Sequence, residues 1–182
     1  DPALGRPGVL HIGDVGWSTW EELNVCFEGG MNFGWPLFEG MEPQPSYSAT
    51  SVANQDHSNP LFDGISCTIQ YFRFNDLLVQ DTPIHLNGHP NPCDGQTQVP
   101  ASVPRHFHAR PAIDWDHDNR SRSGGFDGNQ AVTFDLDAPD APVPGPRFGG
   151  YAAIAGPSAQ GLILPAAFQA GMFHADYAAG WI

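Results

Sequence analysis

The sequence predicts an all-β chain made of short strands and many turns, and three observations support this fold class. The apolar runs are short, and each is bounded by Gly, Pro, Asn or Asp. Gly contributes 21 and Pro 18 of the 182 residues, spread along the chain, which leaves little room for long helices. A unit of apolar strand, Asp, short turn and Gly-Trp occurs near both ends. With 41% hydrophobic and 12% aromatic residues, the chain can bury a core.

Six apolar runs are expected to form strands, and two other segments have some helical character. Tyr71–Val79 has apolar residues at mixed spacing, and Pro165–Ala170 favours a single turn after its proline. The expected strands are Val9–Ile12, Glu22–Phe27, Ala112–Trp115, Ala131–Leu136, Tyr151–Ile154 and Met172–Ala175.

Residues 41–110 differ from the rest in being rich in Pro, Asn, Ser, Gln and His, with few periodic runs. We expect a long, loop-rich insertion, assigned to 41–103. Because structureless stretches of this length are unusual in compact domains, it is expected to cap a site or to be partly mobile.

The recurring unit indicates β-propeller blades. Gly8-Val-Leu-His-Ile-Gly-Asp14 with Gly16-Trp17 matches Gly171-Met-Phe-His-Ala-Asp176 with Gly180-Trp181. At roughly 40–45 residues per blade, the chain holds at most about four blades, and about three once the insertion is discounted. Three blades cannot close a ring, so residues 1–182 are expected to be a fragment of a single propeller domain. An independent β-sandwich is the other architecture that this strand content allows.

The net charge is −13, with 20 acidic residues against seven basic ones, all of them Arg. Without a basic stripe, binding to nucleic acid or to an anionic membrane surface is not expected. No apolar run reaches the length of a membrane span. The acidity is explained either by solubility or by a site for cations such as calcium.

The three cysteines predict one disulfide bond. Cys67 and Cys93 lie in loops rich in Pro, Asn and Gly, where a cross-link supplies the order that packing does not. We expect a Cys67–Cys93 bridge with Cys26 as a buried free thiol; the alternative is three reduced cysteines. The spacing fits no zinc template.

The stretch from Gly13 to Pro36 combines three tryptophans with two adjacent carboxylates. Glu21 and Glu22 would point to opposite faces of a strand, so they are not a converging acid/base pair. One is expected near a calcium ion or a catalytic group, unless both are merely charges at a sheet edge. Trp17, Trp20 and Trp35 could stack on a sugar ring or a flat cofactor, or belong to the core.

Glycine lets backbone carbonyls turn inward as calcium ligands, which makes this stretch suited to a cation site. The glycines in question are Gly13, Gly16, Gly29, Gly30 and Gly34.

Two further motifs have weaker metal-binding character. His106 and His108 alternate, so both imidazoles would lie on one strand face, but no third ligand accompanies them. Asp114-Trp-Asp-His-Asp118 begins like a calcium loop but fails the EF-hand pattern at Asn119 and Gly125, so a solvated turn is expected.

The Gly13–Pro36 stretch and the C-terminal region resemble the glucose/sorbosone dehydrogenase family, soluble quinoprotein sugar dehydrogenases with a six-bladed β-propeller. The resemblance covers residues 5–40 strongly and 104–182 moderately. The motifs are Gly13-Asp-Val-Gly-Trp, Trp20-Glu-Glu-Leu-Asn24, Gly30-Met-Asn-Phe-Gly-Trp-Pro36, Glu39-Gly40, Gly149-Gly150, Phe173-His-Ala-Asp-Tyr177 and Gly180-Trp-Ile182.

The resemblance implies oxidation of aldoses at the anomeric hydroxyl, with pyrroloquinoline quinone as hydride acceptor and calcium polarising it. It implies that the carbonyls of Gly16 and Trp17 hold the cofactor's calcium and that Glu21 is a supporting carboxylate. It places Glu22 and Phe33 near a second, structural calcium.

The family's catalytic histidine and Arg-Asn cofactor contacts lie upstream of this chain, and its last Arg contacts lie downstream. The Lys expected near the final motif is replaced by His174-Ala-Asp-Tyr177. The isolated chain is therefore expected to be inactive, within a periplasmic or extracellular sugar dehydrogenase-like parent. The alternative is a non-catalytic propeller that binds carbohydrate or a protein partner.

Overall fold

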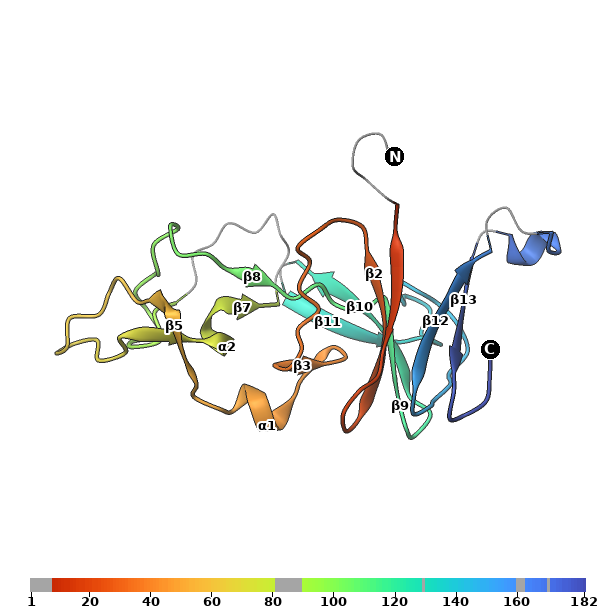
Figure 1. Ribbon diagram of the computed structural model, residues 1–182, viewed down its shortest axis with the longest axis horizontal. Helices are drawn as coiled ribbons and strands as arrows, with labels where there is room; N and C mark the ends of the chain where they lie inside the picture. Colours follow the sequence, from red (N-terminus) through yellow and green to blue (C-terminus); the bar gives the residue numbers. More distant parts are fainter. Residues whose placement is uncertain (1–7, 81–89, 129, 160–162, 170) are drawn as a thin grey trace.

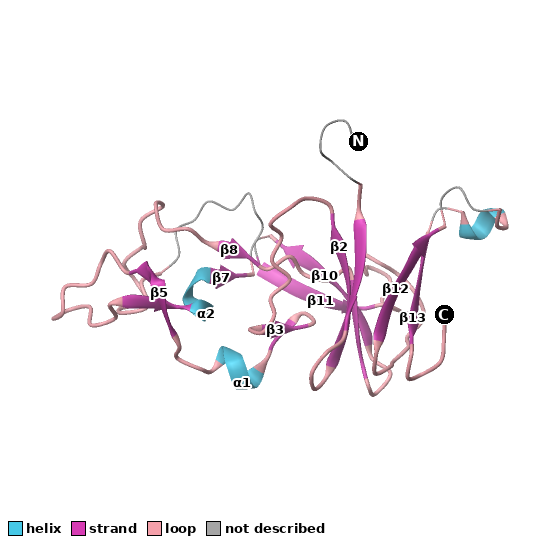
Figure 2. Cartoon of the chain, in the orientation of Figure 1, coloured by secondary structure: helices cyan, strands magenta, loops and turns pink. Residues whose placement is uncertain are grey.

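A computed structural model of the chain describes residues 8–80, 90–128, 130–159, 163–169 and 171–182. The described residues form short β-strands with a few one-turn helices, so the all-β prediction is confirmed (Figure 2). Within these ranges the sheets are open and do not close into a ring.

The largest element is an antiparallel sheet of five strands in the order β1-β2-β9-β10-β11. Neighbouring strands in this sheet are consecutive in the chain, except that a long excursion, described for residues 27–80 and 90–112, separates β2 from β9. The bounds are β1 Leu10–Asp14, β2 Trp20–Cys26, β9 Ile113–Asp116, β10 Ser121–Asp127 and β11 Gln130–Asp135.

A hairpin of β12 (Ala153–Ser158) and β13 (Met172–Asp176) packs on one face of this sheet (Figure 1). A Cβ at Gly13 would lie 2.6 Å from the Ala155 nitrogen, so this approach of β1 to β12 requires glycine. The core between the layers contains Leu23, Ile113, Trp115, Leu136 and Ala153.

The excursion between β2 and β9 contains small pairs of strands that extend away from the main sheet (Figure 1). The antiparallel pairs are β3 (Phe38–Glu39) with β4 (Glu42–Pro43) and β5 (Ala53–Ser58) with β6 (Tyr71–Arg73); the parallel pair is β7 (Leu78–Val79) with β8 (His106–Phe107). The one-turn helices are α1 (Pro45–Ser48), α2 (Phe74–Leu77) and, near β13, the 3-10 helix η2 (Ala166–Phe168).

The insertion is more ordered than the sequence predicts. Phe72, Leu77 and Val99 form a small buried core of their own. A disulfide bond joins Cys67 to Cys93, as predicted. Cys26 is free, but it is half-buried rather than buried, because it lies near the end of β2.

All six predicted strands are present, with shifted ends. The short strands β3 to β8 of the excursion were not predicted, and neither was β10 of the main sheet. Its sequence, SRSGGFD, is polar and contains two glycines, so it has neither strand propensity nor an apolar run. The expected solvated turn at Asp114–Asp118 is wrong for its first half, because Asp114 and Asp116 are buried in β9. The helical character expected at Tyr71–Val79 is confined to α2.

Candidate functional site

The turn between β1 and β2, residues 15–19, is held by a carboxylate from β3. The Glu39 carboxylate accepts hydrogen bonds from the backbone amides of Ser18 (2.7 Å), Thr19 (2.6 Å) and Trp20 (3.2 Å). Burial raises the pKa of Glu39, but the amide donors outweigh it, and the net pKa lies below its ordinary value. A Cβ at Gly16 would collide with the Trp20 carbonyl and this carboxylate. The turn is therefore fixed by Glu39 and needs glycine at position 16.

Glu21 lies behind this turn, on the face of β2 that meets β12. Its side chain is fully buried, and Oε2 accepts a hydrogen bond from the Ala153 amide at 2.9 Å. Its other oxygen, Oε1, has no hydrogen-bond partner among the described residues and lies 3.7 Å from Nε2 of His117. Burial raises the pKa of Glu21. His117, in the turn between β9 and β10, packs its partly exposed ring against Tyr151, with centroids 4.4 Å apart.

Glu22 points to the opposite face of β2, as predicted. Its Oε1 accepts from the Gly40 amide at 2.6 Å, and its Oε2 lies 2.9 Å from the Asn24 side-chain nitrogen. Burial raises the pKa of Glu22 to about 8, so the carboxyl is neutral at pH 7. The alternative that these glutamates are charges at a sheet edge is wrong, since β2 lies between β1 and β9.

Two of the three tryptophans gather with a tyrosine into an exposed cluster. The ring centroids of Trp17, Trp35 and Tyr47 are 5.6 to 6.1 Å apart in each pairing. Trp17 is 65% and Trp35 50% exposed. Trp20 does not join them: it is buried, with the Arg122 guanidinium 3.5 Å from its ring centroid.

A hollow of about 500 Å³ opens beside this aromatic cluster. Trp35 and Tyr47 line one part of it, and Val52, Phe74 and Leu78 line another. Its walls are thus mainly apolar with a few polar groups, which is typical of sites for small ligands.

The two alternating histidines do not form a metal centre. His108 is buried, stacks on Phe38 at 4.3 Å and places Nδ1 3.0 Å from the Gln80 side-chain nitrogen. Burial and the charge of Arg110 lower the pKa of His108 to about 4. His106 is exposed and meets the ring of His57 edge-on. Throughout the described ranges, no three His, Cys, Asp or Glu side chains are arranged to hold a metal ion.

The residues that the resemblance assigns to calcium divide into two groups. Gly16 and Trp17 lie in the turn beside Glu21, whose buried Oε1 has no hydrogen-bond partner among the described residues and is an oxygen of the kind that binds calcium. Burial raises the pKa of this carboxyl and so favours its neutral form when no cation is bound. Glu22 lies on the opposite face of β2, with Oε1 bound by the Gly40 amide and Oε2 beside the Asn24 side chain. Phe33 lies elsewhere: its backbone contacts the buried side chain of His108. The structure thus brings Gly16, Trp17 and Glu21 together and places Glu22 on the opposite face of β2.

Tyr47 and His117 are among the site residues that sequence reasoning missed. Tyr47 belongs to α1, in the segment expected to be a loop, and His117 belongs to the motif expected to be a solvated turn. The only signal for either was its residue type, so pairing them with the Gly13–Pro36 stretch required the tertiary structure.

No family model, curated protein or solved structure matches this chain. In the described part of the chain, no helix has the length and apolar character needed to cross a membrane.

Proposed function

We propose that this chain is part of a quinoprotein sugar dehydrogenase-like β-propeller and that it recognises carbohydrate at the aromatic cluster of Trp17, Trp35 and Tyr47. The observation that carries the proposal is the exposure of these rings beside a hollow. Large apolar rings gathered on a surface mark binding sites. A ring with one edge exposed to solvent suits a ligand that has both apolar faces and hydroxyl groups.

The propeller architecture, with about three of six blades in this chain, is part of the same proposal. Antiparallel meanders stacked face to face are the building units of propellers. The meander β9-β10-β11 and the β12–β13 hairpin stacked on the sheet agree with such units. The disulfide bond between Cys67 and Cys93 favours an oxidising compartment, the periplasm or the exterior.

Calcium and pyrroloquinoline quinone are the cofactors proposed for the intact parent, with the carbonyls of Gly16 and Trp17 as calcium ligands. When bound, this pair would supply a polarised hydride acceptor. Within this chain, Glu39 keeps the turn in shape and Glu21 offers a buried carboxylate behind it. The catalytic base would come from a part of the parent outside these residues, so the chain alone should not turn over aldoses.

Binding of sugars to the chain tests the proposal directly. Chemical shifts of the indole N–H groups would be followed during titration with glucose and with a glucose oligosaccharide. Trp17→Ala and Trp35→Ala should each weaken binding by about tenfold, since each removes one stacking ring. Phe168→Ala, which removes an exposed ring in η2, should leave binding unchanged. Absence of saturable binding, or equal binding by all variants, would refute the proposal.

A non-catalytic propeller that binds carbohydrate or a protein partner is the second candidate. The observation in its favour is Glu22, which is buried with Oε1 bound by the Gly40 amide where the enzyme family keeps a residue near calcium. Calorimetry with calcium, with and without the quinone, separates the two. A quinone-dependent increase in calcium affinity supports the enzyme, and calcium binding that ignores the quinone supports the second candidate.

A further inference from the structure

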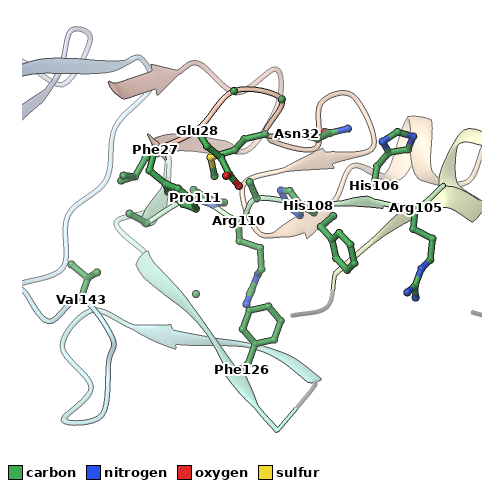
Figure 3. A pocket seen from close by; sticks show the side chains of 18 residues that line it. Phe27, Glu28, Asn32, Arg105, His106, His108, Arg110, Pro111, Phe126 and Val143 are labelled. Carbon is green, nitrogen blue, oxygen red and sulfur yellow. The ribbon is translucent and has the colours of Figure 1, made fainter. Parts of the chain in front are cut away.

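A second hollow, of about 590 Å³, lies where the segment after β2 meets the segment before β9 (Figure 3). We call it the arginine hollow. Its walls include Phe27, Asn32, Arg110, Pro111 and Phe126. Asn32 and His106 also line the hollow beside the aromatic cluster, so the two hollows adjoin.

Arg110 is the unusual group in this hollow. Its Nη1 donates to the Gly125 carbonyl at 2.6 Å and its Nη2 to the Val132 carbonyl at 2.9 Å, while Nε is buried without a hydrogen-bond partner. The guanidinium carbon lies 5.6 Å from the ring centroid of Phe126, and Figure 3 shows the side chain reaching toward that ring. Its contacts are therefore neutral carbonyls and a ring.

Four other arginines among the described residues have a carboxylate partner. Ion pairs join Arg73 to Asp76, Arg120 to Asp116, Arg122 to Asp114 and Glu42, and Arg147 to Asp135 and Asp137. No described carboxylate lies within ion-pair distance of Arg110. Asp114 and Glu42 attract it from farther away, but both already hold Arg122, whose own charge opposes that of Arg110.

A half-buried cation without a counter-ion is costly in a medium of low dielectric, and an anion brought beside it recovers part of that cost. Arg105 and the exposed Glu28 also line the hollow. Most of the remaining wall is apolar, including Phe27, Phe107 and Val143. The hollow thus combines the positive charge of Arg110 with walls that are mostly apolar.

We propose that the arginine hollow binds a small organic monocarboxylate, with the carboxylate beside Arg110 and a flat apolar body against Phe27, Pro111 and Phe126. A monocyclic aromatic acid fits within the volume available, which lies in the range usual for small-molecule sites. Inorganic phosphate would satisfy the charge but leave the apolar wall without a contact. This site is independent of the sugar site proposed above.

Fluorine NMR with 4-fluorobenzoate tests the proposal, and 4-fluorobenzamide serves as the neutral ligand of the same shape. The acid should bind saturably and the amide about tenfold more weakly or not at all, since a charge-assisted bond to guanidinium is lost. Arg110→Gln should weaken binding of the acid by about tenfold. Because this variant also loses bonds to two carbonyls and could fail to fold, Val143→Trp provides a second test by filling the hollow from its half-exposed rim.

Arg147→Gln, which removes a surface guanidinium paired with Asp135, is the matched control and should retain binding. Trp17→Ala should also retain it, so failure of this site and failure of the sugar site can be told apart. Equal binding of acid and amide, or full binding by Val143→Trp, would overturn the proposal. Displacement of the acid by equimolar inorganic phosphate would overturn the role of the apolar wall.

Discussion

Glu22→Gln is the substitution whose effect the structure predicts most sharply, because it removes a buried ionisable group without changing its shape. In the folded chain, Glu22 is 5% exposed and lies between the Gly40 amide and the Asn24 side chain. The Asn24 oxygen Oδ1 is buried without a partner. Turning this amide over would let a protonated Glu22 donate to Oδ1, and glutamine offers the same donor.

The sign and size of the effect follow from linkage. The pKa of Glu22 rises from 4.5 to about 8 on folding, chiefly because burial disfavours the charged carboxylate. Between these values the unfolded chain loses its proton while the folded chain keeps it, so the free energy of unfolding falls as pH rises. At about 1.4 kcal/mol for each pKa unit, the loss on full titration is on the order of 5 kcal/mol. The glutamine variant does not suffer this loss.

Urea unfolding followed by tryptophan fluorescence, at about pH 5 and about pH 8.5, measures the difference. Glu22→Gln should match the parent near pH 5 and exceed its free energy of unfolding by a few kcal/mol near pH 8.5. Glu28→Gln, an exposed control, should follow the parent at both pH values. A difference between Glu22→Gln and the parent that stays constant with pH would refute the buried, neutral carboxyl.

Three further variants probe the insertion, the core and the surface. Replacing Cys67 and Cys93 with serine opens a cross-link across 26 residues and should cost about 3 kcal/mol, confined to the insertion and seen as faster proteolysis there. Trp115→Ala should lower the free energy of unfolding by roughly 3–5 kcal/mol, because it empties the core and removes the indole donor of Asp176. Trp17→Ala, at an exposed ring, should cost less than about 1 kcal/mol in the same urea titration.

Local pattern predicted the strands that carry their own apolar run, and failed where tertiary contacts define the element. Runs such as Met172–Ala175 became strands because alternation and flanking turns need no partner information. The strand β10 is defined by its neighbours on both sides, β9 and β11, and by a core that accepts the small, fully buried Ser121 and Ser123. The insertion folds around a three-residue core and a disulfide bond, and only the disulfide left a signal in the sequence.

The site shows the same division. The period of a strand was sufficient to place Glu21 and Glu22 on opposite faces. It was not sufficient to show that Glu39, 19 residues from Trp20, would supply the carboxylate that holds the turn. Likewise, the partner of Trp17 and Trp35 is a tyrosine from a one-turn helix, and Arg110 becomes notable only because the folded chain leaves it without a carboxylate.

Glu39 and Glu22 attach the segment around Gly40 to the sheet through opposite protonation states. The pKa of Glu39 is lowered, so its contribution is present at neutral pH and is lost as pH falls through its folded pKa. The pKa of Glu22 is raised to about 8 because ionisation buries a charge, even though the Gly40 amide favours the charged form. The stability of the folded chain, and with it the protection of Gly40, therefore falls as pH rises through that value. Because Gly40 donates its amide to Glu22 and follows Glu39 directly, its protection should depend on both.

Hydrogen exchange at the Gly40 amide, corrected for the intrinsic rate, should therefore be slowest between mildly acidic pH and about pH 8 and accelerate on either side. Glu39→Gln should abolish the acceleration at acidic pH, and Glu22→Gln should abolish the acceleration above about pH 8. If either single variant lost the acceleration at both acidic and alkaline pH, one carboxyl alone would attach this segment. That result would contradict the opposite protonation states.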